Sequence, residues 1–192
     1  MIKLSERENK TVYRDGNRII KEGPADIISD EFYWYQTISK TTILIPKIYD
    51  ITDNIIVLEY VEQNSKIDIC SIKELKKYIS IMSKLPAPKR NFEEFAHFRN
   101  KELLKEKKIF ENYYSLIHGN FELRNIIFNE NGPYLIDPLI RSKYKGPPMF
   151  NSYLVDYGSL YFSIDNYFKE TLKNDYHNLV EILYKKTNIF SN

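Results

Sequence analysis

The residues best suited to chemistry lie in one segment of the chain, residues 116–138. An Asn-Gly pair in this segment separates two short apolar runs and predicts a β-hairpin. If Phe128 pairs with Tyr134, then Asn125 faces Asp137 at the open end, where opposed side chains lie about 5 Å apart. An amide oxygen and a carboxylate at that distance can share a hard cation such as Mg²⁺. A polar mouth in an ordinary hairpin is the alternative interpretation of this pair.

The same segment resembles the catalytic and metal-binding segment of kinase-like small-molecule phosphotransferases, the superfamily of aminoglycoside and choline kinases. Their pattern is His-Gly-Asp, four residues, Asn, and then a hairpin that ends in Ile-Asp. The chain matches it at His118, Gly119, Asn125, Ile136 and Asp137. The Ile-Asp-Pro ending, with a later Asp-x-x-x-Leu motif, is most similar to the capsular-polysaccharide-associated branch. The resemblance implies that Asn125 and Asp137 bind Mg²⁺ and that His118 belongs to the catalytic loop.

Asn120 departs from this pattern. It stands where these phosphotransferases carry the aspartate that accepts or orients the proton of the substrate hydroxyl. An amide cannot accept that proton, and general-base assistance contributes about 10²- to 10⁴-fold. Three explanations stay open: a natural pseudokinase, an active enzyme with another base, for which Glu122 is the nearest carboxylate, and a deliberate inactivating substitution. Nucleotide and metal binding can persist where turnover is weak, because phosphoryl transfer depends mainly on positioning and charge neutralisation.

The resemblance extends to the first 60 residues. Lys21 matches the lysine that contacts the α- and β-phosphates of ATP, and Glu31 matches its ion-pair partner. Residues 56–61 resemble the hinge between two lobes, where backbone groups of Glu59 and Val61 would hydrogen-bond adenine. An apolar run of this kind suits a purine ring, although it is equally a good core strand.

The turn at residues 5–9 differs from the phosphate loop of protein kinases, because it contains two glutamates and no glycine. Tight wrapping of phosphates is not expected there, although Ser5 or backbone amides can still contact a phosphate. Arg124 suits a phosphate or a carboxylate equally. The basic stretch that contains Arg141 and Lys143 suits an anionic acceptor or a solvated loop.

Asp156 belongs to the later Asp-x-x-x-Leu motif. We interpret it as structural support for the catalytic loop, through backbone hydrogen bonds or through His118, and not as a reacting group.

The elements that must position these residues follow from the pattern of apolar residues and turns. Runs typical of strands occur at residues 2–5, 10–14, 18–21, 47–49, 54–60 and 126–136. A helix that Ser29 or Asp30 caps and Pro46 ends is expected between the third and fourth runs. Further helices are expected at residues 71–85, with Ser71 as N-cap, and at 91–114, 152–172 and 175–187.

This order predicts an α+β fold, a bilobal protein-kinase-like architecture. Residues 1–62 would form an N-lobe, a small antiparallel sheet with one helix that binds nucleotide phosphates. Residues 63–192 would form a mainly helical C-lobe that carries the catalytic hairpin and the metal site.

The composition excludes several classes of binding partner. A net charge of +2, from 28 Lys and Arg against 26 Asp and Glu, gives no excess for binding nucleic acid. Cys70, the single cysteine, excludes an intramolecular disulfide and a cysteine zinc cage. No apolar run approaches the roughly 18 residues that span a bilayer. We therefore expect a cytoplasmic protein without a membrane partner.

The sequence is thus interpreted as an ATP- and Mg²⁺-dependent phosphotransferase. Its acceptor would be a hydroxyl of a small molecule, a sugar or an amino alcohol, with activity impaired by Asn120. The alternatives are a pseudokinase that acts as a nucleotide-binding scaffold for a protein partner, and an atypical protein Ser/Thr kinase. Asp137-Pro138 in place of Asp-Phe-Gly disfavours the last.

Overall fold

The computed structural model describes residues 1–7, 10–86, 115–139 and 153–164. Five antiparallel strands form one sheet in the order β1-β2-β3-β5-β4. Their bounds are Ile2–Arg7 for β1, Lys10–Asp15 for β2, Arg18–Glu22 for β3, Ile48–Ile51 for β4 and Ile55–Glu59 for β5. The predicted strands are thus present, with shifted ends. Because β1 continues to Arg7, Ser5 lies in a strand and not in the turn where the sequence placed it.

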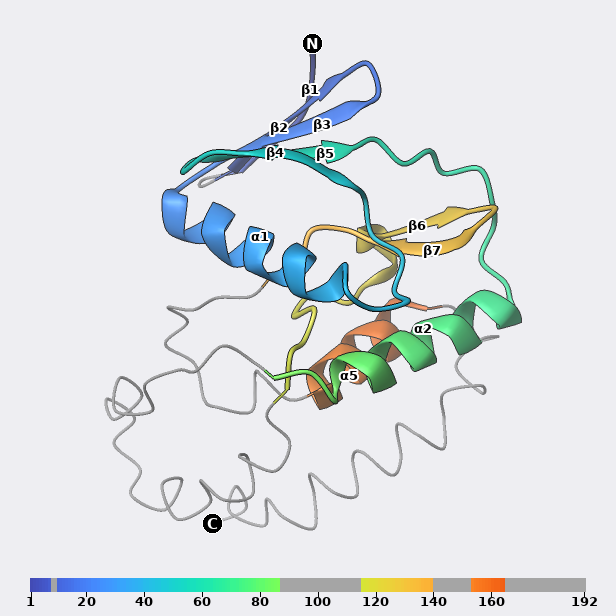
Figure 1. Ribbon diagram of the computed structural model, residues 1–192. Helices are drawn as coiled ribbons and strands as arrows, with labels where there is room; N and C mark the ends of the chain where they lie inside the picture. The colour runs from blue at the N-terminus through green and yellow to red at the C-terminus, as the bar shows by residue number, and fades with distance from the viewer. Residues whose placement is uncertain (8–9, 87–114, 140–152, 165–192) are drawn as a thin grey trace, which may run out of the picture.

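Helix α1, Ala25–Ile38, packs beneath the sheet (Figure 1). The predicted caps were wrong at both ends. The helix begins after Pro24, whose fixed φ is compatible with a helix start and whose carbonyl accepts the N–H of Ile28 at 3.0 Å. It ends at Ile38, well before Pro46, because the hydroxyls of Ser39 and Thr41 bind carbonyls of its last turn at 2.9 and 2.7 Å.

The elements that follow the sheet in the chain pack against α1 through a shared core. Its elements are α2 (Ile69–Met82), the 3₁₀ turn η2 (Leu123–Asn125), β6 (Ile126–Asn129), β7 (Gly132–Leu135) and α5 (Tyr153–Ser163). The N-cap of α2 is Asp68 and not Ser71, because the Asp68 carboxylate accepts the N–H of Ser71 at 2.6 Å. The predicted helices at 91–114 and 175–187 lie outside the described residues, as does the end of the one at 152–172.

One hydrophobic core joins the helices, the hairpin and the part of the sheet formed by β3, β4 and β5. It includes Trp34 of α1, Leu58 of β5, Leu75 of α2, Leu135 of β7 and Leu160 of α5, each at most 2% exposed. The division into lobes at residue 62 stays a prediction. No helix within the described ranges has the length and apolar character that crossing a membrane requires.

The hairpin that closes the site forms as predicted, but the predicted register was wrong by one residue. Phe128 pairs with Pro133, and the turn consists of Glu130 and Asn131. Gly132 belongs to β7, where its φ of +127° suits glycine. Asn125 is therefore opposite Ile136, whose N–H donates to the Asn125 carbonyl at 3.0 Å. Asp137 lies one residue beyond this pair.

Candidate active site

Lys21 and Glu31 form a buried ion pair between the sheet and α1. Lys21 is in β3, and its ammonium contacts Glu31 Oε1, with side chains 7% and 2% exposed. It also lies 3.4 Å from Asp137 Oδ1. Burial lowers the pKa of Lys21, but the Glu31 and Asp137 carboxylates outweigh burial and raise the pKa above its usual value. The ammonium is therefore charged at neutral pH.

Asp137 directly follows the hairpin and has a left-handed backbone, with φ at +56°. Few residues other than glycine adopt this conformation, and such strain concentrates at functional sites. Its N–H donates to the Tyr35 hydroxyl at 3.3 Å, and its Oδ1 binds the ammonium groups of Lys10 and Lys21. Burial raises the pKa of Asp137, but these two cations lower it well below the usual range. The carboxylate is therefore ionised.

Lys10 and Tyr35 are site residues that the sequence reasoning missed. Lys10 begins β2, two residues before Val12, which pairs with Lys21 in the sheet register. Alternation along a strand therefore puts Lys10 and Val12 on one face, beside Lys21. Tyr35 lies four residues after Glu31, one turn further along the same face of α1. Both periodicities were available from sequence once Lys21 and Glu31 had been chosen.

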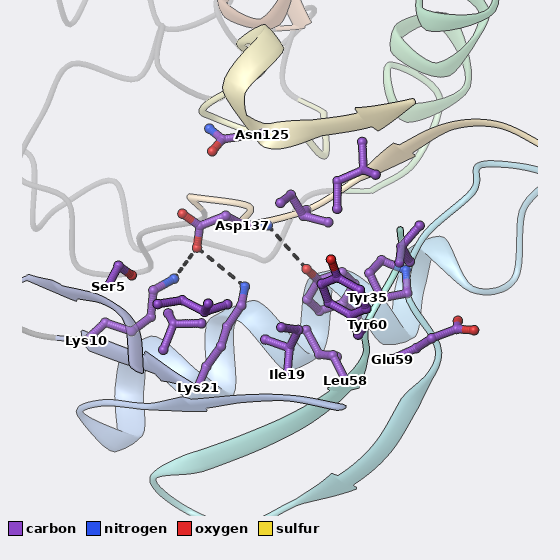
Figure 2. A pocket seen from close by; sticks show the side chains of 16 residues that line it. Ser5, Lys10, Ile19, Lys21, Tyr35, Leu58, Glu59, Tyr60, Asn125 and Asp137 are labelled. Atoms are coloured by element: carbon purple, nitrogen blue, oxygen red, sulfur yellow. Dashed lines mark hydrogen bonds and ion pairs between the residues drawn. The ribbon is translucent and has the colours of Figure 1, made fainter. Parts of the chain in front are cut away.

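A cavity of about 270 Å³ opens beside this network (Figure 2). Its charged end contains Lys10, Lys21 and Asp137, and its other end contains Glu59, Tyr60 and Val61. Apolar side chains from the sheet and the hairpin form most of the remaining wall. These are Leu4, Val12, Ile19, Leu58, Ile127 and Ile136. The cavity therefore combines an apolar slot with an end that carries both lysine and carboxylate side chains.

The predicted hinge residues line this cavity but differ in the backbone groups that they offer. The Glu59 N–H donates to the Lys47 carbonyl at 2.8 Å, so only the Glu59 carbonyl is left for a ligand. The Val61 N–H has no hydrogen-bond partner within the part of the chain that the structure describes. Ser5 also lines the cavity, from β1.

The loop at residues 118–120 is held from below by Asp156 of α5. The Asp156 carboxylate accepts the N–H groups of His118 at 2.7 Å and Gly119 at 2.9 Å. Burial raises the pKa of Asp156 to about 7, although these two donors oppose the shift. Burial also lowers the pKa of His118 to about 4. His118 is therefore neutral, and its Nε2 lies 2.9 Å from the Ile136 carbonyl, to which it can donate.

Asn120, where the resemblance to phosphotransferases implies a base, is half-buried and supports the loop through its backbone. Its carbonyl accepts the Nδ2 group of Asn125 and the N–H of Glu122, both at 2.8 Å. The Glu122 carboxylate binds Arg124 Nε at 2.7 Å. Arg124 thus contacts a carboxylate, and Glu122 is paired with a cation. Neither of these two described residues lines the cavity, and Arg141 and Lys143 lie outside the described residues.

Asn125 and Asp137 both line the cavity despite the changed register. The Asn125 amide nitrogen donates to the Asn120 carbonyl, so the Oδ1 atom of Asn125 is left as a possible metal ligand. Asp137 Oδ2 has no partner among the described residues, because both lysines bind Oδ1. Two hard oxygen donors fit Mg²⁺, which keeps waters or phosphate oxygens as its other ligands. The described residues contain no group of three His, Cys, Asp or Glu side chains that could hold a metal ion without such help.

The sequence model of the RIO domain matches residues 6–139, which include every residue of the ion network. The chain belongs to the RIO domain family. None of the curated proteins matches it in sequence. Solved structures extend the comparison at the level of the fold.

Three of these structures are phosphotransferases or their relatives. The ADP-bound aminoglycoside phosphotransferase APH(2'')-Ib is 13% identical, with a TM-score of 0.54 over 100% of this chain and 86% of that one. The streptomycin-ATP ternary complex of APH(2'')-IIa is 13% identical, with a TM-score of 0.51 over 96% and 76%. A choline/ethanolamine kinase family protein from Mesorhizobium loti is 14% identical, with a TM-score of 0.52 over 96% and 76%. The predicted kinase-like phosphotransferase fold is confirmed.

Proposed function

We propose that this RIO domain binds ATP and Mg²⁺ in the cavity between the sheet and the hairpin. It would transfer the γ-phosphoryl group to a hydroxyl of a small molecule, such as a sugar or an amino alcohol. The observation that carries the proposal is the buried Lys21–Glu31 pair beside Asp137, at the charged end of a largely apolar cavity. Support among the solved structures comes from the complex of a similarly folded protein with both streptomycin and ATP.

Each end of the cavity has a role in this proposal. The apolar end takes the adenine, with the Val61 N–H as donor, and Lys21 binds phosphate while Glu31 holds it in place. Asn125 and Asp137 are the metal ligands. When bound, Mg²⁺ neutralises negative charge on the phosphates as the γ-phosphoryl group leaves.

Asn120 would limit turnover and not binding. Its amide can orient a hydroxyl by a hydrogen bond but cannot take its proton, and Glu122 is engaged with Arg124. We therefore expect Asn120→Asp to increase ATP turnover, by about 10²-fold if the general-base contribution lies at the low end of its usual range.

Nucleotide titration, with and without Mg²⁺, tests the binding step. We expect Mg²⁺-dependent ATP binding that Asp137→Ala weakens, while Asp53→Ala, an exposed carboxylate outside the cavity, has no effect. Absence of Mg²⁺-dependent binding would refute the proposal. Binding without any turnover, in the Asn120→Asp variant as well, would indicate a nucleotide-binding scaffold for a protein partner.

An atypical protein Ser/Thr kinase is the second candidate, and the RIO domain match also suggests it. The Asn120→Asp variant separates the two candidates when it is incubated with labelled ATP and either a mixture of sugars and amino alcohols or a protein extract. Label in the small molecules supports our first proposal. Label in polypeptide Ser or Thr supports the second.

A further inference from the structure

Lys10 is largely buried among charged residues, although the family resemblance gave it no role. It starts β2, and its ammonium contacts the Asp137 carboxylate and lies 3.2 Å from Glu31 Oε2. Its side chain is 16% exposed, whereas Lys77, in an ordinary surface ion pair, is 68% exposed. Such burial costs hydration and rotamer freedom. The contacts of Lys10 with both carboxylates therefore call for a chemical explanation.

The net charge of the cluster formed by Lys10, Lys21, Glu31 and Asp137 depends on Lys10. Glu31 and Asp137 carry two negative charges, and Lys21 alone would leave this cluster with a net charge of −1 beside the cavity. An anionic phosphate chain would then be repelled. Lys10 brings the cluster to neutrality, and its ammonium has three N–H groups, one more than its contacts with Glu31 and Asp137 use.

The sequence before Lys10 lacks the residues that would let backbone N–H groups bind a phosphate closely. Glycine-rich turns bind phosphates through backbone N–H groups that approach closely because no Cβ intervenes, and residues 5–9 contain no glycine. Glu6 does not compete for Lys10, because it pairs with Lys3 at 2.5 Å and its side chain is 66% exposed. Lys10 is thus a cation that lines the cavity directly after a stretch of sequence without glycine.

We propose that Lys10 is a phosphate-binding residue that takes the place of a glycine-rich turn and releases the Asp137 carboxylate to the metal when a nucleotide binds. This inference rests on the proposed function. Lys10 on Oδ1 and a divalent cation on Oδ2 of the same Asp137 carboxylate repel each other, so the presence of one weakens the binding of the other. The flexible lysine side chain can then turn its ammonium to the phosphates.

Calorimetric titration of Lys10→Met tests the phosphate contact. We expect its affinity for ATP with Mg²⁺ to fall about tenfold, equivalent to about 1.4 kcal/mol, as the loss of one charge-assisted contact predicts. Adenosine, which has no phosphate, should bind the variant and the wild type equally. Lys10→Arg should retain most of the ATP affinity, and Lys77→Met, which removes an exposed lysine, is the matched control.

Binding of Mn²⁺ alone, followed by electron paramagnetic resonance, tests the competition. Lys10→Met should bind Mn²⁺ more tightly than the wild type, by about threefold or more, because the competing ammonium is gone. Weaker ATP binding together with tighter Mn²⁺ binding is a combination that general loss of structure cannot produce. If Lys10→Met does not fold, as judged by thermal unfolding, Lys10→Gln replaces it.

Several results would overturn the inference. Unchanged ATP affinity in the variant would refute the phosphate contact and leave the proposed function standing. An equal loss of ATP and adenosine binding would show that Lys10 only supports the structure. Weaker Mn²⁺ binding would refute the competition, and failure of the wild type to bind any nucleotide would refute the proposed function as well.

Discussion

The pair formed by His118 and Asp156 makes a prediction about stability that the pH dependence of unfolding can test. Both groups are fully buried, and the His118 N–H donates to the Asp156 carboxylate. Their titrations change stability in opposite directions, because burial raises the pKa of Asp156 to about 7 and lowers that of His118 to about 4. Removing one of them should expose the effect of the other.

Asp156 favours the folded state at lower pH. Between its ordinary pKa of 3.8 and its folded value of about 7, the folded protein holds a proton that the unfolded chain has lost. The free energy of unfolding therefore falls as the pH rises through this window. Between pH 5 and pH 7 these pKa values give a loss of about 2 kcal/mol.

His118 acts in the opposite sense. Between its folded pKa of about 4 and its ordinary value of 6.5, the unfolded chain holds a proton that the folded protein lacks. The free energy of unfolding therefore rises with pH, also by about 2 kcal/mol between pH 5 and pH 7. The two contributions nearly cancel in the wild type, whose stability should change little from this pair.

Asp156→Asn removes one contribution and leaves the other. The asparagine oxygen can accept only one of the two backbone N–H groups, so the variant should lose about 1–3 kcal/mol at pH 5 from the unpaired donor. Its free energy of unfolding should then rise by about 2 kcal/mol from pH 5 to pH 7, relative to the wild type. Urea unfolding at both pH values, followed by tryptophan fluorescence, measures this difference. Parallel pH profiles for the two proteins would refute our account of Asp156.

Three further variants test the packing of the site. In urea titrations, Gly119→Ala should lose about 3 kcal/mol of unfolding free energy and Gly16→Ala about 1 kcal/mol. Both glycines have positive φ, but only at position 119 does an added Cβ lie 2.4 Å from a carbonyl oxygen. Equal losses in the two variants would contradict the clash. Tyr35→Phe should cost about 1 kcal/mol and speed hydrogen exchange at the Asp137 amide, whose acceptor it removes; unchanged exchange would count against that bond. Lys21→Met should lose about 3 kcal/mol or more of unfolding free energy, because the buried Glu31 carboxylate loses its main partner. The double variant Lys21→Met/Glu31→Gln should regain part of this free energy, and no regain would refute a charge effect.

The family resemblance, supported by the local order of elements, was enough to predict that Lys21 and Glu31 come together. A lysine near the end of β3 and a glutamate in the helix that follows it are separated by one short connection, so few arrangements are open to them. Lys10 could not be found in this way. Its contact with Asp137 joins residues 127 positions apart and depends on the packing of the sheet against the hairpin.

The hairpin shows how a small local error changes a site prediction. Counting Gly132 as part of the turn shifted every cross-strand pair by one residue. Asn125 and Asp137 nevertheless line one cavity, because Asp137 leaves the strand with positive φ and its side chain is no longer governed by strand alternation. Alternation predicts side-chain direction only while the backbone stays extended, so this outcome could not be read from the hairpin pattern.

The two departures from the phosphotransferase pattern act on different steps. The turn without glycine concerns nucleotide binding, and Lys10 offers a side-chain substitute there. The replacement of aspartate by Asn120 affects proton transfer. The loop is supported at this residue by its backbone carbonyl, which accepts hydrogen bonds from Asn125 and Glu122. Asp156 holds the neighbouring backbone independently of the side chain at position 120. Asn120→Asp therefore changes one proton acceptor while the loop keeps its supports, so a gain of turnover would report on chemistry and not on folding.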